Sequence, residues 1–436
     1  MKHFDSINAK IKYYLQKLAG SGSSGSVLKN MSILASGSGA AKVIGLATYP
    51  VITRIYSPAD FGVMAVFTSA ITILVPFATM RYSITLPLPK TDVMAMNIFV
   101  LGSLLIIALS LILSGMFVVA GEAVFGFFNM NEIASYWWLL IIGILGASFY
   151  ELLSNWATRK KSFTPIAKTN IWQSSISAIT KIGLGYAGLK PMGLLIGVVA
   201  QRGSGVFSLM RYFLNDFKEN IDKVTPKRII FIFKYYRDLP LYRLPSQFLL
   251  VFATKMPVLF FAFQYGAETT GQLGLSILFV GIPMGLIGTT TAKAYYAEIA
   301  MIGAKQREKI LSVTKSITKR LFLLSLIPTL ILLLFSPFLF QFIFGAEWIQ
   351  AGEFTSILAF YLFIQFITTP LVNIFTVYNM QRKFLEINIV RIIIVGVVFG
   401  MAYNWNMDVY QTLLMYTISI SGHYIFTGYQ VYKIIK

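Results

Sequence analysis

The sequence contains no cysteine and few charged residues, and each shortage excludes a class of protein. Without a thiol, the chain forms no disulfide, binds no metal through thiolates and uses no cysteine nucleophile. Charged residues make up 12% of the chain, whereas soluble globular chains carry about a quarter. A large core does not explain this deficit, because large soluble proteins still expose a charged surface. The composition therefore predicts a chain surrounded by lipid.

Enzyme and motor motifs are also missing. The chain has no G-x-x-x-x-G-K-[ST] loop, no H-E-x-x-H and no G-x-S-x-G, which are signatures of nucleotide hydrolysis, zinc proteolysis and serine hydrolysis. We therefore expect a protein that is not an enzyme and holds no metal or cofactor. The net charge of +20 does not indicate a nucleic-acid partner, because the basic residues form short clusters between apolar runs rather than one stripe.

A series of apolar segments is long enough to cross a bilayer. A spanning helix needs about 20 mostly apolar residues, and twelve such segments follow one another along the chain. They predict an all-α polytopic membrane protein with twelve transmembrane helices. The predicted spans lie near residues 29–54, 58–82, 94–119, 134–157, 164–188, 191–212, 243–266, 270–296, 320–345, 352–378, 384–404 and 408–432.

The basic residues predict the orientation of these spans. Most of the 37 Lys and Arg residues fall in every second connection, including 211–243 and 305–320. Cytoplasmic connections are the ones enriched in Lys and Arg, so both termini are expected in the cytoplasm. Tryptophans near span ends are expected to form an interfacial belt. The tryptophans in these positions are Trp137, Trp138, Trp156, Trp348 and Trp405.

The chain divides into two halves of six spans each, preceded by a different kind of segment. Apolar residues share one helical face over 5–18, which predicts an amphipathic helix on the inner membrane surface. The Gly- and Ser-rich stretch 20–26 is expected to be a flexible joint. The predicted parts are the surface helix with its joint, 1–28; the N-lobe, 29–212; a cytoplasmic inter-lobe linker, 213–242; and the C-lobe, 243–436.

The two halves echo each other in sequence. Gly62 and Gly271 open the second span of their halves, and two prolines in each half are 26 residues apart. An internal duplication explains this match, and coincidence is the alternative. A proline inside a span kinks its helix, so these prolines either shape the helices or act as hinges. The proline pairs are Pro50 with Pro76, and Pro257 with Pro283.

Five basic residues lie inside predicted spans and away from their ends. Lys42, Arg202 and Lys255 fall near the middle of theirs, where a charge costs at least about 2.5–3.5 kcal/mol. Such residues should face a wet interior or a partner. Lys181 lies in the outer third of its span and Arg391 nearer the inner end, so snorkelling toward an interface is their alternative.

Acidic residues do not balance these cations, because only Glu151 lies inside a span and away from its ends. The imbalance predicts a water-filled cavity in which the substrate supplies the missing anion. A phosphate or pyrophosphate fits, since guanidinium groups match phosphate oxygens and ammonium groups act as point charges. Glu151 either binds a coupling proton or sodium ion or pairs with a cation such as Lys42. Near span ends, the entry candidates are Arg54, Arg81 and Lys293, and surface snorkelling is their alternative.

Short motifs recur in a fixed order through roughly residues 30–300. In order and spacing they resemble the polysaccharide flippases, of the O-antigen and capsule type, in the multidrug/oligosaccharidyl-lipid/polysaccharide exporter superfamily. The last four spans are only generically similar. The motifs are Pro50-Val51-Ile52-Thr53-Arg54, Ser57-Pro58, Phe61-Gly62, Arg81-Tyr82, Leu86-Pro87, Trp156 to Lys160, Leu239-Pro240, Pro245-Ser246-Gln247, Ile282-Pro283 and Ile287-Gly288.

This resemblance implies a V-shaped pair of six-helix lobes around a central cationic cavity, in a bacterial inner membrane. The implied substrate is an undecaprenyl-pyrophosphate-linked oligosaccharide, flipped to the outer leaflet by alternating access. Its implied partners are membrane lipids, a polysaccharide polymerase and a chain-length regulator. One rival is a multidrug extruder of the same superfamily, whose organic cations favour an anionic site. Another is a membrane-embedded polymerase or glycosyltransferase, which needs a large outer loop or a carboxylate site.

Overall fold

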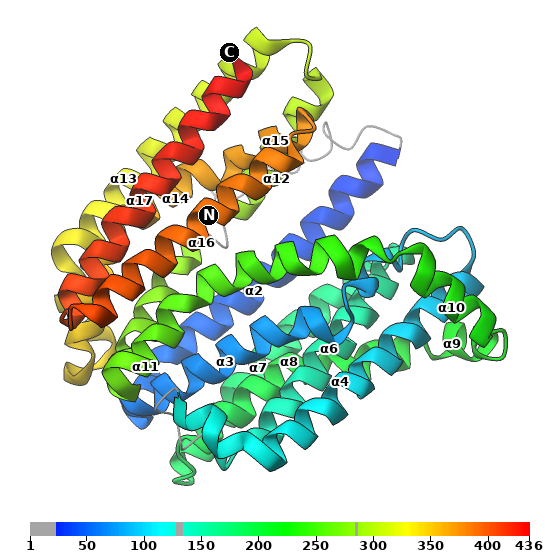
Figure 1. Cartoon of the computed structure of the whole chain (residues 1–436), viewed down its shortest axis with the longest axis horizontal. Coiled ribbons are helices and arrows are strands. Elements are labelled where there is room, and N and C mark those ends of the chain that lie inside the picture. Colours follow the sequence, from blue (N-terminus) through cyan, green and yellow to red (C-terminus); the bar gives the residue numbers. More distant parts are fainter. Residues whose placement is uncertain (1–22, 128–133, 284–286) are drawn as a thin grey trace, which may run out of the picture.

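The computed structural model describes residues 23–127, 134–283 and 287–436, which fold into helices joined by short connections (Figure 1). In these ranges there is no strand. Eight of the described helices are long and apolar enough to cross a membrane. The prediction of an all-α polytopic membrane protein is therefore confirmed, while the count of twelve spans stays a prediction. The surface helix expected at 5–18 lies outside the described residues.

The helices fall into two groups separated by a helical linker. The first group is α2 (Ser23–Ile55), α3 (Pro58–Ala78), η1 (Tyr82–Thr85), α4 (Asp92–Phe127), α6 (Trp137–Arg159), α7 (Phe163–Tyr186) and α8 (Met192–Tyr212). The linker holds α9 (Leu214–Ile221), α10 (Pro226–Tyr235) and η2 (Leu239–Arg243). The second group is α11 (Leu244–Pro283), α12 (Thr289–Ile302), α13 (Arg307–Phe344), η4 (Ala346–Trp348), α14 (Ile349–Thr368), η5 (Thr369–Asn373), α15 (Ile374–Val377), α16 (Gln381–Asn404) and α17 (Val409–Ile435).

Local sequence signals fix where some of these helices begin. Ser57 accepts a hydrogen bond from the backbone of Asp60, whose carboxylate accepts one from the backbone of Ser57, and Pro58 occupies the first turn. Asp408 and Gln411 form the same reciprocal cap at the start of α17. Such caps satisfy backbone N–H groups that have no partner within the helix.

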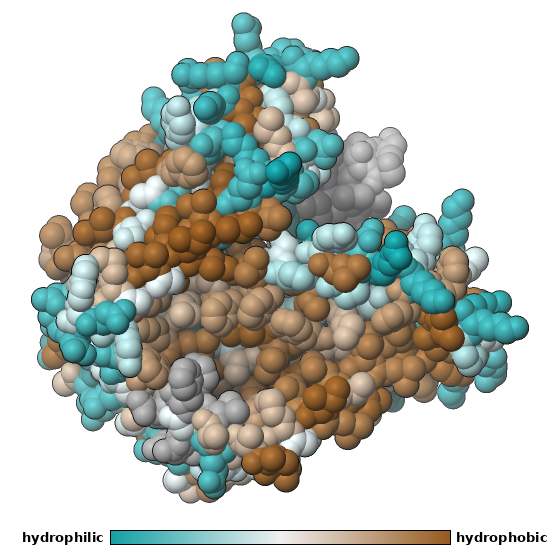
Figure 2. Space-filling view, viewed as in Figure 1, coloured by the Kyte–Doolittle hydropathy of each residue, from teal (hydrophilic) through white to brown (hydrophobic). Residues whose placement is uncertain are grey.

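The two groups form two bundles that meet at one end and diverge at the other (Figure 1). We call them the first bundle (23–212) and the second bundle (244–435). The apolar core that contains Phe99 and Trp156 fills the first bundle and extends to Phe344 of the second, and a separate core in the second bundle contains Phe261 and Phe399. Apolar side chains also cover much of the visible surface, while hydrophilic ones gather at the extremities (Figure 2). This distribution is the one that a lipid environment requires.

Two boundaries differ from the sequence predictions, whereas the break between the seventh and eighth spans agrees with them. Helix α11 contains parts of both spans and is interrupted at Gly266, where φ is 80° and where the seventh span is predicted to end. Helix α13 begins at Arg307, within the basic connection expected at 305–320. Hydropathy marks only the lipid-facing part of a helix, and Lys and Arg are good helix formers that continue it beyond the lipid. Helix α2 begins at Ser23, so the joint expected at 20–26 is helical in part, because extending an existing helix is easier than starting one.

The predicted tryptophan belt is wrong for two of its members. Trp156 and Trp348 are completely buried, whereas Trp138 and Trp405 are exposed. Burial is tolerated because both indole N–H groups have acceptors. The Trp156 nitrogen lies 3.4 Å from a carboxylate oxygen of Asp216, and the Trp348 nitrogen donates to a backbone carbonyl.

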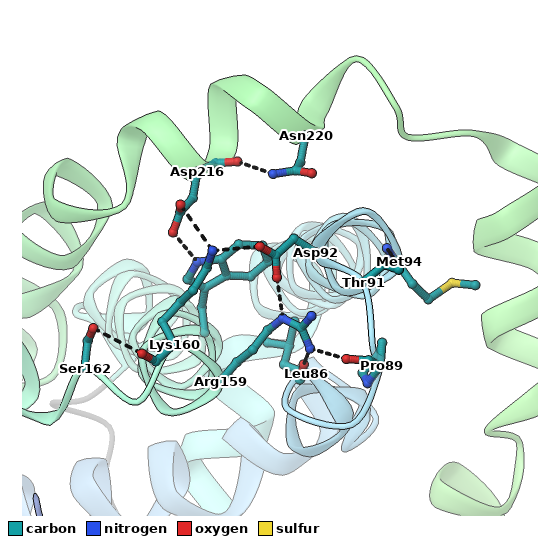
Figure 3. A network of polar contacts seen from close by, with 11 residues as sticks. Leu86, Pro89, Thr91, Asp92, Met94, Arg159, Lys160, Ser162, Asp216 and Asn220 are labelled. Atoms are coloured by element: carbon teal, nitrogen blue, oxygen red, sulfur yellow. Dashed lines mark hydrogen bonds and ion pairs between the residues drawn. The ribbon is translucent and has the colours of Figure 1, made fainter. Parts of the chain in front are cut away.

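A network of charged residues in the first bundle reaches the linker at Asp216 (Figure 3). Arg159 donates to Asp92 at 2.9 Å, and Lys160 contacts Asp92 at 2.7 Å and Asp216, on α9, at 3.2 Å. The Arg159 guanidinium also donates to the carbonyl oxygen of Pro89. Burial alone lowers the pKa of the Lys160 ammonium, but its hydrogen bonds to the two aspartates outweigh this and raise the pKa.

Two further hydrogen bonds attach the rest of the linker. The Tyr82 hydroxyl donates to the carbonyl oxygen of Phe233 at 2.9 Å, and the backbone N–H of Thr225 donates to Asn97 at 3.1 Å. The segment expected as a connection at 213–242 is thus a helical unit that packs on α4. We call this side of the molecule the linker end.

The two bundles touch at the opposite end, which we call the junction end. A Cβ atom at Gly62, on α3, would lie 1.9 Å from the carbonyl oxygen of Ala267, on α11. One at Gly271 would lie 1.7 Å from the carbonyl oxygen of Pro58. Only glycine permits this close approach of two backbones. The two glycines that open corresponding spans of the two halves are therefore the residues at which the bundles cross.

Candidate functional site

A chamber lies among α2, α7, α8 and α11. It consists of three adjoining cavities of about 570, 350 and 520 Å3, and Gln201 lines all three. The first two also share Tyr49, Ile277 and Leu278. We call the three together the central chamber, and its walls come from both bundles because α11 contributes to them.

Three of the predicted cations converge on the cavity of about 350 Å3. Lys181 comes from α7, Arg202 from α8 and Lys255 from α11. Lys255 lies near enough to Arg202 for the two positive charges to repel each other, and Arg202 donates to the Thr72 hydroxyl at 3.3 Å. No acidic side chain is among the described residues that line this cavity. The arrangement concentrates positive charge in a low-dielectric site, where an anion is bound strongly.

Lys181 is held in place by its packing. Its side chain is 5% exposed, and its ammonium lies 5.8 Å from the centre of the Tyr49 ring. The aliphatic part crosses Gly197, where an added Cβ would come within 2.3 Å of the lysine Cγ. The Tyr56 hydroxyl donates to the carbonyl oxygen of Lys181 at 2.7 Å. The side chain thus points into the bundle rather than toward a membrane interface.

Lys42 and Glu151 line the other two cavities. Lys42 is exposed within the cavity of about 570 Å3, and Glu151 lies with Arg202 on the cavity of about 520 Å3. The Glu151 carboxylate accepts a hydrogen bond from Ser83 at 2.6 Å and lies 3.4 Å from the Arg81 guanidinium. The cation paired with Glu151 is therefore Arg81 rather than Lys42.

Arg391 lies apart from the other predicted cations. It projects from α16 in the second bundle, donates to the Tyr424 hydroxyl, and stacks 4.9 Å from the centre of that ring. The face of an aromatic ring stabilises a cation, so this arginine has a partner without an acidic residue. Its interaction is with the core of the second bundle.

The entry and hinge candidates occupy different environments. Arg54 and Lys293 are exposed, whereas Arg81 has a left-handed backbone (φ 63°) at the turn after α3. Pro50 and Pro76 lie inside α2 and α3. Pro257 is buried inside α11, and Pro283 is the last residue of that helix. The backbone break in α11 is at Gly266, not at a proline.

Neutral polar residues of the chamber were missed at the sequence level. Asn170 and Gln173 on α7, together with Gln201 on α8, line it. The sequence does not single them out, because a neutral amide within a span costs less than a charge and therefore stands out less. The signal was present, since Asn170, Gln173, Ser174, Ser177 and Lys181 follow helical spacing along one face of α7.

No cluster of three His, Asp or Glu side chains suited to a metal ion occurs in the part of the chain that the structure describes. The groups that line the chamber are cations, the Glu151 carboxylate, carboxamides, hydroxyls and aromatic rings. These groups bind polar ligands by charge and hydrogen bonding.

The arrangement of two helical bundles around an internal polar chamber is the fold of multi-pass membrane transporters. Residues 51–353 match the family model described as polysaccharide biosynthesis protein. The chain belongs to this polysaccharide biosynthesis family, which confirms the resemblance seen in the sequence. No curated protein sequence is significantly similar to it.

Solved structures share the fold at low sequence identity. An inward-facing multidrug resistance MATE family transporter of the MOP superfamily is 14% identical, with a TM-score of 0.64 over 92% of each chain. The lipid II flippase MurJ, in an inward closed conformation, is 12% identical, with a TM-score of 0.66 over 91% of this chain and 87% of that one. An outward-facing MATE family transporter is 15% identical, with a TM-score of 0.53 over 96% of both chains.

Proposed function

We propose that this protein flips an undecaprenyl-pyrophosphate-linked oligosaccharide from the cytoplasmic to the outer leaflet of a bacterial inner membrane. The observation that carries the proposal is the convergence of Lys181, Arg202 and Lys255 on one cavity that no acidic side chain lines among the described residues. A pyrophosphate supplies the negative charge that this cavity lacks. Membership of a polysaccharide biosynthesis family supports a glycan as the cargo.

Alternating access is the mechanism that the two bundles support. In this conformation they touch at the junction end and diverge at the linker end (Figure 1). The TM-score is higher against the inward-facing MATE transporter than against the outward-facing one. We infer that the linker end is cytoplasmic, that the chain is in an inward-facing state, and that the bundles act as the two lobes. Rocking about the junction would then open the chamber to the other side.

Each class of residue has a distinct part in this proposal. The chamber cations bind the pyrophosphate, the sugars occupy the rest of the chamber, and the lipid tail stays in the bilayer. A proton or sodium gradient, or the substrate gradient itself, drives the cycle. The glycan would serve O-antigen, capsule or exopolysaccharide synthesis, with a polymerase and a chain-length regulator acting on it after transport.

The multidrug extruder is the second candidate, favoured by the MATE-like fold. Organic cations are repelled by a cavity lined with Lys181, Arg202 and Lys255. The chamber's charge therefore supports an anionic cargo over a cationic drug.

Surface glycan display tests the proposal. In a strain that lacks the gene, the wild-type chain should restore surface glycan, whereas Arg202→Gln and Lys255→Gln should lower it at least about tenfold, because each removes a charged hydrogen-bond donor from the anion. Lys309→Gln, an exposed cation at the start of α13, is the matched control. Membrane levels of every variant are measured in parallel.

Two outcomes would contradict the proposal in different ways. Unchanged surface glycan in the deletion strain, with no second flippase present, would reject the function. Full rescue by both chamber variants would keep the function and reject the cationic site.

A further inference from the structure

We infer that the chamber contains a separate neutral subsite for sugar hydroxyl groups, formed by Ser38, Asn170, Gln173 and Gln201. This inference rests on the proposed function and assigns different parts of the ligand to different cavities of the chamber. The cations of the 350 Å3 cavity hold the pyrophosphate, and the carboxamides of the adjoining 570 Å3 cavity, which Lys42 also lines, hold the sugars.

The first observation is an unsatisfied amide. Gln173 is 7% exposed, yet its side-chain nitrogen has no hydrogen-bond partner among the described residues. A buried polar group without a partner is destabilising. The nitrogen has almost no accessible surface, and Gln173 lines two cavities, so a ligand there would complete it once the amide turns toward them. A sugar hydroxyl accepts a hydrogen bond from such an amide.

The second observation is that the fold makes room for this side chain. A Cβ atom at Gly205, on α8, would lie 2.5 Å from the Gln173 nitrogen and 2.5 Å from a ring carbon of Tyr150. The missing side chain at Gly205 thus allows the amide and the aromatic ring to lie side by side. Tyr150 lines the 520 Å3 cavity together with Gln173.

The third observation is an ordered chain of polar groups beside this amide. The Tyr150 hydroxyl donates to Asn170 at 3.0 Å, and the Asn170 amide donates to the Ser38 hydroxyl at 3.1 Å. These bonds orient the Asn170 carboxamide in the wall of the 570 Å3 cavity, which Ser38 also lines. Neutral donors and acceptors at fixed positions suit an uncharged polyhydroxyl ligand, because hydroxyl groups both donate and accept.

Gln201 joins the neutral subsite to the cations. It is exposed, lines all three cavities, and directly precedes Arg202 in α8. A ligand with a pyrophosphate at Arg202 and Lys255 would therefore place its first sugars beside Gln201 and Gln173. This order matches the covalent order of a lipid-linked oligosaccharide, in which sugar follows phosphate.

Binding to the full chain in lipid nanodiscs tests the inference. The probes are undecaprenyl pyrophosphate and the undecaprenyl-pyrophosphate oligosaccharide extracted from the producing strain. The wild type should bind the sugar-bearing lipid more tightly. Gln173→Leu and Gln201→Leu should each weaken that binding roughly three- to tenfold, the effect of one hydrogen bond, and leave the bare lipid unchanged. Gln341→Leu, an exposed position on α13, is the matched control.

The outcomes separate this inference from the function on which it rests. Equal affinity of the wild type for both lipids would overturn the neutral subsite while pyrophosphate recognition stands. A preference for sugar that both leucine variants retain would also overturn it, since the sugar is then bound elsewhere. Binding of neither lipid would reject the proposed function as well. If Gln173→Leu fails to fold, Gln201→Leu, which changes an exposed side chain, still decides the matter.

Discussion

The indole N–H of Trp348 donates to the backbone carbonyl oxygen of Thr53 at 3.1 Å, and this bond joins the two bundles. Thr53 lies in the last turns of α2, and Trp348 directly precedes α14. The Trp348 ring also packs edge-to-face on Phe61, with 4.7 Å between ring centres. Because these contacts cross the junction end, they must break if the chamber is to open on that side.

Replacement of Trp348 by phenylalanine removes the hydrogen bond and keeps an aromatic ring. The conformation with a closed junction should lose about 0.5–1.5 kcal/mol of stability. The ratio of junction-open to junction-closed molecules should therefore rise roughly three- to tenfold. The chain has no cysteine, so Thr158→Cys and Lys305→Cys provide a spin-label pair without background. The distance between the two spin labels, across the linker end, should shorten as the junction opens. Trp405→Phe, at an exposed tryptophan, is the control, and an unchanged distance distribution would show that the bond does not hold the junction.

The glycine crossing at the junction gives a second prediction. Gly62→Ala places a methyl group where the backbone of Ala267 lies, and overpacking of this kind costs about 1–3 kcal/mol. The thermal unfolding temperature of the purified protein should fall. At Gly115, where an added Cβ meets nothing within 4 Å, the same substitution should be neutral or slightly stabilising. Equal effects at the two glycines would mean that the crossing is not tightly packed in the membrane.

The sequence predicts the helical fold and several residues of the chamber, because both predictions depend on the high free-energy cost of a charge in lipid. Lys42, Arg202 and Lys255 were found from their depth in apolar spans, and all three line the chamber. Arg391 also lies inside a predicted span, nearer its inner end, but it stacks on Tyr424. Depth shows that a charge needs a partner, and it does not show which partner. That choice depends on helix packing, which one sequence does not reveal.

Tertiary contacts also explain what was missed. Trp348 was assigned to an interfacial belt because it lies near the end of a span, and its burial depends on Thr53, 295 positions away in sequence. Gln173 carries no charge, so its position within a span does not mark it as a residue that needs a partner. The roles of both residues arise where segments far apart in sequence meet.

The attachment of the linker gives a third prediction. Asp216→Asn weakens the contact between α9 and Lys160. Both side chains of this ion pair are partly exposed, so the attachment of α9 should lose about 1 kcal/mol of free energy. Amide hydrogen exchange over residues 214–221 should then become faster, because α9 detaches more often. Asp222→Asn, an exposed position at the end of the same helix, should change exchange little. Protection equal to the wild type would show that apolar packing alone holds α9.

The pair formed by Glu151 and Arg81 allows a double-mutant test of the two interpretations of Glu151. Glu151→Gln leaves the largely buried Arg81 guanidinium without its counter-charge. The expected destabilisation is about 1–2 kcal/mol, below that of a fully buried pair because both side chains keep some contact with solvent. Arg81→Gln in the same chain should restore part of the lost thermal stability, since neither charge is then unpaired.

Transport by the single variant Glu151→Gln and by the double variant decides the role of the carboxylate. If Glu151 only balances Arg81, surface glycan display should fall with Glu151→Gln and recover in the double variant along with stability. This is the result that we expect, because the structure gives Glu151 a cation and a hydroxyl as partners. Recovery of stability without recovery of display would instead assign the coupling ion to Glu151, since no second substitution replaces a carboxylate that must bind a proton or sodium ion.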